Sequence, residues 1–168
     1  MARYVEGKFD ETQLPTHGVD FMEKTIALGD EEILFSIWDI GGTTDSESML
    51  PLLCNDAAVM LLMFDLTRPE TLDAVREWHR KARGLNPCAL PIFVGCKYDQ
   101  LLELPADEHM RMFTVSQQLA ASTGAPIIFC AASAQINVTN LFKVILIRLF
   151  GLVPAVPELS QLGEPMLL

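Results

Sequence analysis

The chain has 168 residues, with 12 Lys and Arg against 22 Asp and Glu, and half of its residues are apolar. Since a globular domain has about 150 residues, this length predicts one compact domain with a sizeable core. The net charge of -10 occurs with a charged fraction of only 20% and a positive mean hydropathy, which excludes intrinsic disorder. The acidic balance also argues against a nucleic acid partner, because proteins that bind phosphate backbones present clusters of Lys and Arg.

The sequence predicts a soluble, intracellular protein with no direct membrane anchor. No apolar stretch of a secretory signal follows Met1, and the longest apolar run, residues 57–64, is far shorter than the ~18 residues that span a bilayer. The last residues do not form a prenylation motif. No pair of cysteines has metal-ligand spacing, which predicts buried free thiols at Cys54, Cys88, Cys96 and Cys130.

The first predicted elements are two strands, residues 19–28 and 32–39, joined by the turn-favouring pair Gly29-Asp30 into an antiparallel hairpin. Three later runs are apolar without alternation, which is typical of parallel strands covered on both faces. These runs are residues 57–64, 92–94 and 127–130.

Helices are predicted between and after these runs. Thr67 stands three residues before Glu70, a pattern that favours a capping box at the start of a helix reaching about residue 85. Two further helices are expected over residues 107–122 and 137–150. Because strands and helices alternate after the hairpin, the sequence predicts an α/β fold with right-handed connections.

Chemically informative residues follow the predicted strands, where ligands bind in such folds. Asp39 precedes Gly41 and Gly42 at the end of the hairpin, and this pattern can hold a divalent cation and admit a phosphate close to the backbone. Lys97 and Asp99 follow a later strand, and they can supply an aliphatic stem and a charged acceptor to a planar base.

Four ordered motifs resemble those of the Ras-superfamily small GTPases. Residues 39–42 match the DxxG motif of switch II, and residues 16–21 resemble the TxGVDF segment of switch I. Residues 96–99 match the [NT]KxD base motif with one change, and residues 133–135 match the SAK loop with one change. The chain is similar over essentially its whole length to the septum-promoting or mitotic-exit GTPases of fungi.

This resemblance implies a three-layer α/β fold of the P-loop NTPase type. Its sheet would be mostly parallel, with one antiparallel edge strand. The small GTPase domain would cover residues 1–151, and residues 152–168 would form a C-terminal tail.

The resemblance implies guanine recognition by the later motifs. Asp99 would accept hydrogen bonds from the guanine ring, Lys97 would pack its stem across the base, and the Ala134 N–H would meet the guanine carbonyl. The other nucleotide-binding positions implied by these motifs are Cys96, Ser133 and Gln135.

The earlier motifs imply contacts to Mg²⁺ and to the γ-phosphate. Asp39 would hold Mg²⁺ through water, Thr16 would ligate Mg²⁺ only while the γ-phosphate is present, and the Gly42 N–H would contact that phosphate. Loss of the phosphate would release both switch segments, which is the physical basis of a GTP-dependent switch. Mg²⁺ with GTP or GDP is therefore the expected cofactor.

Three positions depart from the family pattern. Cys96 replaces an Asn or Thr, and Gln135 replaces a Lys, so weaker guanine affinity is expected. Thr43 stands where many family members carry the Gln that orients the attacking water, which predicts slow GTP hydrolysis at this catalytic position.

The largest departure is the phosphate loop, since GxxxxGK[ST] occurs nowhere in the sequence. Residues 2–10 resemble instead the end of the helix that follows that loop in the family. The preferred hypothesis is an N-terminally incomplete sequence of a working GTPase, in which the absent strand would lie between the second hairpin strand and residues 57–64. A naturally short form is the alternative.

The resemblance implies a GTP-dependent switch in signalling that controls septation, cytokinesis and mitotic exit. The implied partners are GTP and GDP, a GTPase-activating protein complex, a downstream protein kinase and a spindle-pole scaffold, reached through the switch segments. The implied location is the cytoplasm, at the spindle pole body. Two alternatives stay open: a nucleotide-free interaction module, and a fragment that does not fold alone.

Overall fold

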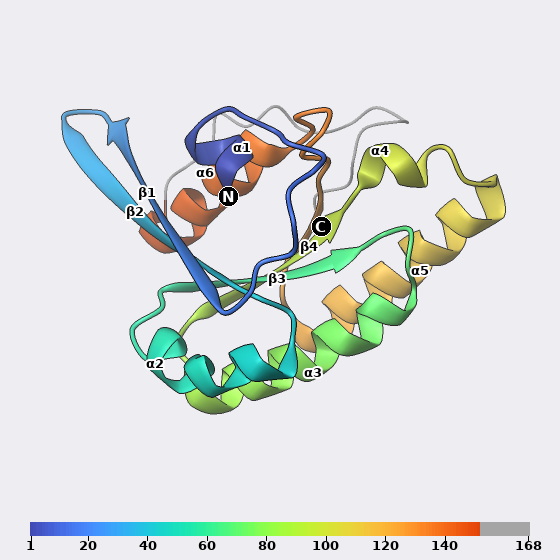
Figure 1. Ribbon diagram of the computed structural model, residues 1–168, viewed down its shortest axis with the longest axis horizontal. Helices are drawn as coiled ribbons and strands as arrows, with labels where there is room; N and C mark the ends of the chain where they lie inside the picture. The colour runs from blue at the N-terminus through green and yellow to red at the C-terminus, as the bar shows by residue number, and fades with distance from the viewer. Residues whose placement is uncertain (152–168) are drawn as a thin grey trace. The chain divides into compact units, whose positions relative to one another are not determined.

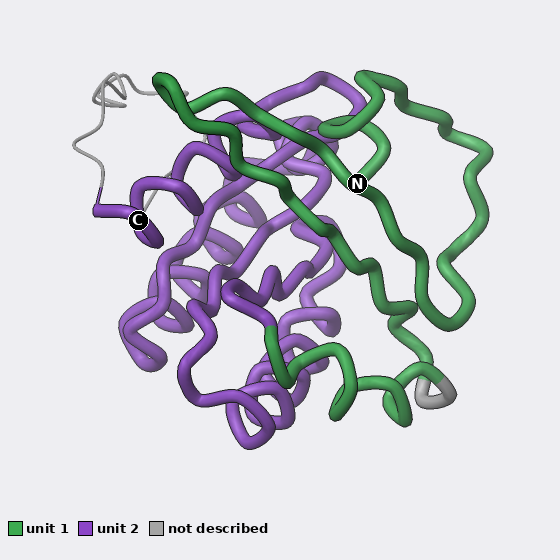
Figure 2. Tube along the Cα trace, turned by 90° about the vertical axis from the view of Figure 1, so that its left-hand side faces the viewer, with its two compact units in different colours: residues 1–56 green, residues 57–168 purple. Residues whose placement is uncertain are grey.

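The computed structural model describes residues 1–151, without the side chains of residues 44 and 45, so the expected tail 152–168 lies outside the described residues. Two compact units divide the chain, residues 1–56 and 57–168, shown in green and purple in Figure 2. Across residues 1–151, each helix is too short or too polar to cross a bilayer.

The first unit is built on an antiparallel hairpin of β1 (Val19–Leu28) and β2 (Glu31–Ile40), as predicted for residues 19–28 and 32–39. Gly29 occupies the turn with a φ of +64°, a conformation that glycine adopts without a steric penalty. A short helix, α1 (Ala2–Val5), precedes the hairpin, and the Tyr4 ring meets the Phe35 ring edge-on at 6.2 Å.

Two short helical segments complete this unit: η1 (Thr44–Met49), a 3₁₀ helix, and α2 (Leu50–Cys54). They were not predicted from the sequence, because segments of about one turn carry no measurable helical periodicity.

The second unit contains a parallel sheet in the order β3-β4-β5, formed by β3 (Val59–Asp65), β4 (Leu90–Cys96) and β5 (Ile127–Phe129). Figure 1 shows α3 (Glu70–Leu85) and α5 (Ala106–Thr123) on one side of this sheet and α6 (Val138–Phe150) on the other. The α/β class and the strand directions are confirmed.

The strands form an antiparallel two-stranded sheet and a parallel three-stranded sheet, consistent with the expected N-terminally incomplete fold, in which an absent strand would lie between β2 and β3. Within the described part of the chain, β3 pairs only with β4. The hairpin is likewise a two-stranded sheet of its own, so β2 and β3 are both edge strands.

The hydrophobic core of the second unit lies between the sheet and the helices α3 and α5. Alternate residues of the strands face these helices, since side chains alternate across a strand. Phe93, Ile127 and Phe129 are almost completely inaccessible to solvent in this cluster. The core therefore fixes the carboxyl ends of β3, β4 and β5 relative to one another.

The predicted capping box at Thr67 and Glu70 is wrong. Helix α3 begins after Pro69 without a side-chain cap, and the Thr67 hydroxyl donates instead to Asp65 Oδ1 at 2.7 Å. The carboxylate outcompetes the helix terminus because it is charged, and hydrogen bonds to charged acceptors are about twice as strong as neutral ones.

Two further features differ from expectation. Helix α4 (Tyr98–Leu101) was not predicted, and it begins directly after Lys97, whose φ of 61° places it in the left-handed region. Of the four free cysteines, Cys54 and Cys130 are buried as predicted, Cys96 is half-buried, and Cys88 is exposed.

Candidate functional site

The carboxyl ends of β4 and β5 bring Asp99 and Ser133 together, although they are 34 residues apart in the sequence. Asp99 lies in α4 just after β4, and Ser133 lies in the turn after β5. The Ser133 hydroxyl donates a hydrogen bond to Asp99 Oδ2. The two predicted base-binding motifs are therefore in direct contact within one unit.

The second oxygen of the same carboxylate is the most informative atom of this cluster. Asp99 Oδ1 is buried and has no hydrogen-bond partner among the described residues. A buried acceptor without a partner costs about 1–3 kcal/mol, so native structures rarely leave one without a role. Two lone pairs on this oxygen suit a ligand with neighbouring N–H donors, such as the edge of a guanine ring.

Lys97 is fixed at both ends of its side chain. Its backbone adopts the left-handed conformation, and its carbonyl accepts a hydrogen bond from the Leu101 N–H at 3.0 Å. Its ammonium lies 2.8 Å from Asp65 Oδ2. Such a conformation is costly for a residue other than Gly or Asn, and strained residues of this kind concentrate at ligand sites.

The turn that contains Ser133, Ala134 and Gln135 is closed by two hydrogen bonds between Ala131 and Ile136. The Ala131 N–H donates to the Ile136 carbonyl at 3.1 Å, and the Ile136 N–H donates to the Ala131 carbonyl at 2.9 Å. Ala134 and Gln135 are exposed at the tip, and Gln135 has a φ of 58°. The two hydrogen bonds thus fix the turn while the backbone at its tip stays accessible to a ligand.

Cys96 is the substituted position of the base motif. Its thiol points to the Val94 carbonyl at 3.8 Å, a weak interaction. Burial, together with the nearby Asp65 carboxylate, raises the pKa of the Cys96 thiol to about 12. The thiol is therefore neutral at physiological pH and supplies much less hydrogen bonding than the expected Asn or Thr.

In the first unit, Thr16 and Asp39 are in contact. The Thr16 hydroxyl donates to Asp39 Oδ2 at 2.8 Å, across 23 residues of sequence. The Gly41 N–H donates to the Gly18 carbonyl at 2.9 Å, which extends the hairpin ladder beyond its strands. The segments that resemble switch I and switch II therefore lie side by side.

Gly41 makes this close approach possible. A Cβ atom at this position would lie 2.2 Å from the Thr16 carbonyl oxygen and 3.0 Å from Ser46 Oγ. Gly42 and Thr43 follow and are exposed, with no atom within 4 Å of a Cβ built on Gly42. The Thr43 hydroxyl lies 3.3 Å from Ser46 Oγ.

Thr16 and Asp39 supply the chemistry that Mg²⁺ requires, since this ion prefers oxygen ligands from one or two side chains and completes its shell with water and substrate phosphates. Within the residues that the structure describes, no group of three or more His, Cys, Asp or Glu side chains could hold a metal by itself. The donor set fits a cation bound together with a nucleotide.

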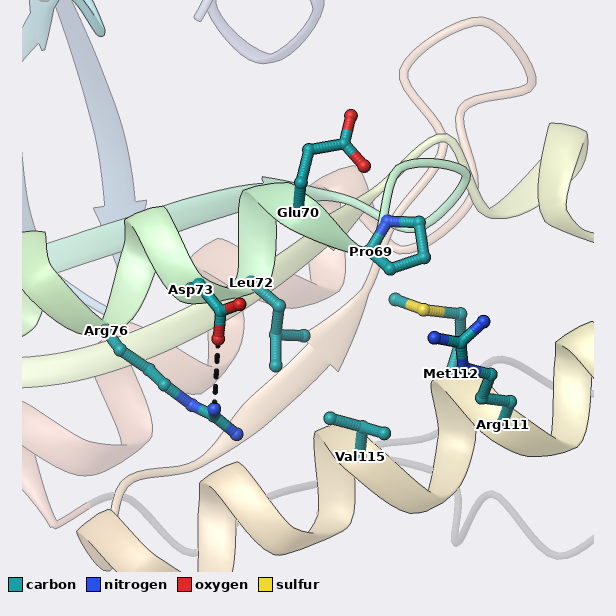
Figure 3. Close-up of a pocket in the computed structure, with 8 residues that line it drawn as sticks. All are labelled: Pro69, Glu70, Leu72, Asp73, Arg76, Arg111, Met112 and Val115. Carbon is teal, nitrogen blue, oxygen red and sulfur yellow. Dashed lines mark hydrogen bonds and ion pairs between the residues drawn. The ribbon is translucent and has the colours of Figure 1, made fainter.

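A separate cavity of about 220 Å³ lies between α3 and α5 (Figure 3). Leu72, Met112 and Val115 form its apolar walls, and Asp73 pairs with Arg76 at 3.2 Å along its rim. None of the candidate residues identified from the sequence lines this cavity.

Sequence reasoning assigned no role to Asp65, although its carboxylate binds Lys97. The signal was present in the chain: Asp65 ends one buried run, and Cys96-Lys97 end the next. In the observed register Asp65 pairs with Cys96 across the parallel ladder. Aligning the ends of the two apolar runs would have placed the acid beside the lysine.

Comparison with known proteins shows the family to which the chain belongs. The model of the Ras family matches residues 1–150. The chain is 44% identical to Septum-promoting GTP-binding protein 1 of Schizosaccharomyces pombe, over 99% of this chain and 84% of that protein. It is 30% identical to Ras-related protein Rab5A of Oryza sativa subsp. japonica, over 88% and 70%, and 26% identical to human Ras-related protein Rab-31, over 85% and 71%.

The fold and these matches define a small GTPase. The chain belongs to the Ras family. Members of this family in general bind GTP and GDP, use Mg²⁺ with them, and interact with regulators and effectors.

Proposed function

We propose that this protein is a guanine-nucleotide-dependent molecular switch in the signalling that controls septation, cytokinesis and mitotic exit. The observation that carries the nucleotide part is the Asp99 carboxylate: Ser133 orients it through one oxygen, and the other is buried without a partner among residues 1–151. The biological part rests on the similarity to a protein named for septum promotion.

The base-binding role falls to residues of the second unit. Asp99 Oδ1 would accept from the guanine N–H groups, and adenine, which lacks those donors at the same edge, would leave the oxygen unsatisfied. Lys97 would cover the face of the base with its aliphatic stem. Ala134 would offer its backbone N–H at the exposed tip of the turn closed by Ala131 and Ile136.

The cation and phosphate roles fall to residues of the first unit. Thr16 and Asp39 would hold Mg²⁺, which neutralises phosphate charge when bound, and Gly42 would offer its N–H to the γ-phosphate. The Thr16 hydroxyl donates to Asp39, so its oxygen lies beside the carboxylate. Thr43 would stand at the water-orienting position, where its short side chain makes hydrolysis slow.

The outward face of the hairpin is suited to the protein partners. Phe21 and Trp38 form a cross-strand pair on one face of the hairpin, with ring centroids 4.4 Å apart, and both residues are at least 40% exposed. Residues 1–56 hold 12 of the 22 Asp and Glu residues but only 3 of the 12 Lys and Arg residues. A GTPase-activating protein complex, a protein kinase and a spindle-pole scaffold are the proposed partners, and they would approach with basic surfaces.

Calorimetry tests the nucleotide part directly. The chain would be titrated with GDP and with GTP in the presence of Mg²⁺, and with ADP as the control nucleotide of equal charge to GDP. Binding of GDP and GTP with no heat from ADP is expected. Equal heats for GDP and ADP, or no heat from any nucleotide, would overturn the proposal.

A second candidate is an interaction module that binds partners without nucleotide turnover. The substitutions at Thr43, Cys96 and Gln135 favour it. It predicts that partner binding to the hairpin face has the same affinity with GTP, with GDP and without nucleotide. The switch predicts tighter effector binding with GTP.

A further inference from the structure

The carboxylate of Asp65 is saturated by hydrogen-bond donors at the end of β3. Oδ1 accepts from the Thr67 N–H at 2.9 Å and from the Thr67 hydroxyl at 2.7 Å. Oδ2 accepts from Arg68 Nε at 2.9 Å and from Lys97 Nζ at 2.8 Å. The residue is only 5% exposed, so these donors replace the water that an ionised carboxylate needs.

The charge of this carboxylate is permanent under physiological conditions. Burial by itself raises the pKa of Asp65, but the hydrogen bonds from Lys97, Thr67 and Arg68 outweigh it and lower the pKa to about 2. Asp65 therefore carries its charge beside the Lys97 ammonium at neutral and mildly acidic pH.

The loop that follows β3 makes Asp65 rigid. The Asp65 carbonyl accepts from the Arg68 N–H at 3.0 Å, and the Asp65 N–H donates to the Thr71 hydroxyl at 3.0 Å. The strand itself pairs with β4, in a register that sets Asp65 beside Cys96. A fixed anion thus stands next to the residue that precedes Lys97.

We infer that Asp65 is a positioning residue for Lys97: it holds the ammonium so that the four-carbon stem is extended between two fixed ends. The base-stacking role of that stem rests on the proposed function. A stem that is already ordered loses little side-chain entropy on binding, and that loss is otherwise of order 1.5–2 kcal/mol for a lysine.

Arg68 provides a matched control because it binds the same oxygen of Asp65 without touching Lys97. Its side chain is 59% exposed and belongs to the loop before α3. Arg68→Gln removes one donor from Asp65 and leaves the pair between Asp65 and Lys97 in place. Asp65→Asn removes the charge that holds Lys97.

The first experiment needs no nucleotide. Lysine acylation is measured by mass spectrometry in the parent, in Asp65→Asn and in Arg68→Gln, with Lys143 as internal reference because it is exposed on α6. Asp65→Asn is expected to accelerate acylation of Lys97 about fivefold relative to Lys143, and Arg68→Gln to change it less than about twofold. Unchanged labelling in Asp65→Asn, or equal acceleration in both variants, would overturn the inference.

A measurement on the unmodified protein covers the case in which Asp65→Asn does not fold. Nitrogen relaxation of the lysine ammonium groups reports their order on the fast timescale. The Lys97 ammonium is expected to be more ordered than that of Lys143. Equal mobility of the two groups contradicts the inference.

The second experiment links the pair to the base. The GDP affinity is measured by calorimetry in the parent, Asp65→Asn, Lys97→Met and the double variant. If Asp65 acts through Lys97, Asp65→Asn weakens binding about tenfold in the parent background and has no further effect in the Lys97→Met background. Additive losses would show that Asp65 acts by another route. Absence of GDP binding to the parent would refute the proposed function, while the labelling experiment would still decide the role of Asp65.

Discussion

Ser133 binds one oxygen of Asp99 and leaves the other oxygen buried without a partner among the described residues. The carboxylate is therefore oriented before any ligand arrives. Preorganisation of this kind raises affinity because the binding site does not have to be ordered during association.

The first prediction concerns the proposed role of Asp99 in selecting the base. Asp99→Asn replaces an acceptor by a donor, so GDP affinity should fall about 10- to 100-fold while affinity for xanthosine diphosphate rises. Calorimetry with both nucleotides measures the change. Asp107→Asn, at an exposed position in the first turn of α5, serves as control and should leave both affinities unchanged. Parallel losses for both nucleotides would contradict the assignment.

The second prediction concerns hydrolysis at Thr43. This residue is exposed, and its hydroxyl lies 3.3 Å from Ser46 Oγ, so a longer side chain can extend into solvent. Thr43→Gln should accelerate single-turnover GTP cleavage by about 10-fold or more, because an amide can orient the attacking water. Rapid-quench measurement with bound GTP gives the rate. A rate equal to that of the parent would refute the assignment of this position.

The third prediction uses the two adjacent glycines. Gly41→Ala forces a Cβ to within 2.2 Å of the Thr16 carbonyl oxygen, so it should destabilise the protein by about 1–3 kcal/mol. Gly42→Ala meets no atom within 4 Å and should change the free energy of unfolding by less than about 0.5 kcal/mol. Urea unfolding measures both variants. Similar effects at the two positions would show that the close approach to Thr16 does not constrain the segment.

The fourth prediction concerns Ser116, which is completely buried on α5 with a hydroxyl that has no partner within residues 1–151. Ser116→Ala removes a desolvated polar group, so the free energy of unfolding should stay unchanged or rise by up to about 1 kcal/mol. A denaturant titration of the parent and of Ser116→Ala measures whether the free energy of unfolding rises or falls. A loss of more than about 1 kcal/mol would mean that the hydroxyl is satisfied in solution.

The fifth prediction follows from the low pKa of Asp65. Its native carboxyl binds fewer protons than the unfolded one at mildly acidic pH, so its stabilising effect is complete above about pH 4 and is lost as the pH falls toward about 2. The total is about 2 kcal/mol. Urea unfolding of the parent and of Asp65→Asn is measured from pH 6 downward. The difference between their free energies of unfolding should shrink as the pH falls from about 4 toward about 2. A pH-independent difference would be inconsistent with the ion pairs.

Most of the fold could be predicted because its elements carry strong local patterns. The unbroken apolar runs gave β3, β4 and β5, and helical spacing placed α3, α5 and α6 within about two residues of their observed ends. The short helices α1, α2 and α4 offered no period to detect. The capping box failed because Asp65, at the end of the preceding strand, competes for the Thr67 hydroxyl.

The sequence predicted candidate site residues but not the hydrogen bonds between them. Motif order identified Thr16, Asp39 and Asp99, and the structure brings Thr16 against Asp39. Which oxygen of Asp99 is satisfied, and which acid holds Lys97, depends on tertiary contacts between strand ends. Local pattern contains no information on such contacts, whereas the parallel register of β3 and β4 does.

The alternation of side chains along the hairpin specifies how its two strands pair. Phe21 and Trp38 share the outward face, and Met22 and Ile37 face the other way in the same register. Sliding one strand by a single residue would bring Glu23 or Glu32 onto the less exposed face, so the pattern favours the observed register. The side-chain pattern therefore specifies the pairing register of the hairpin, and with it the position of Asp39 opposite Asp20.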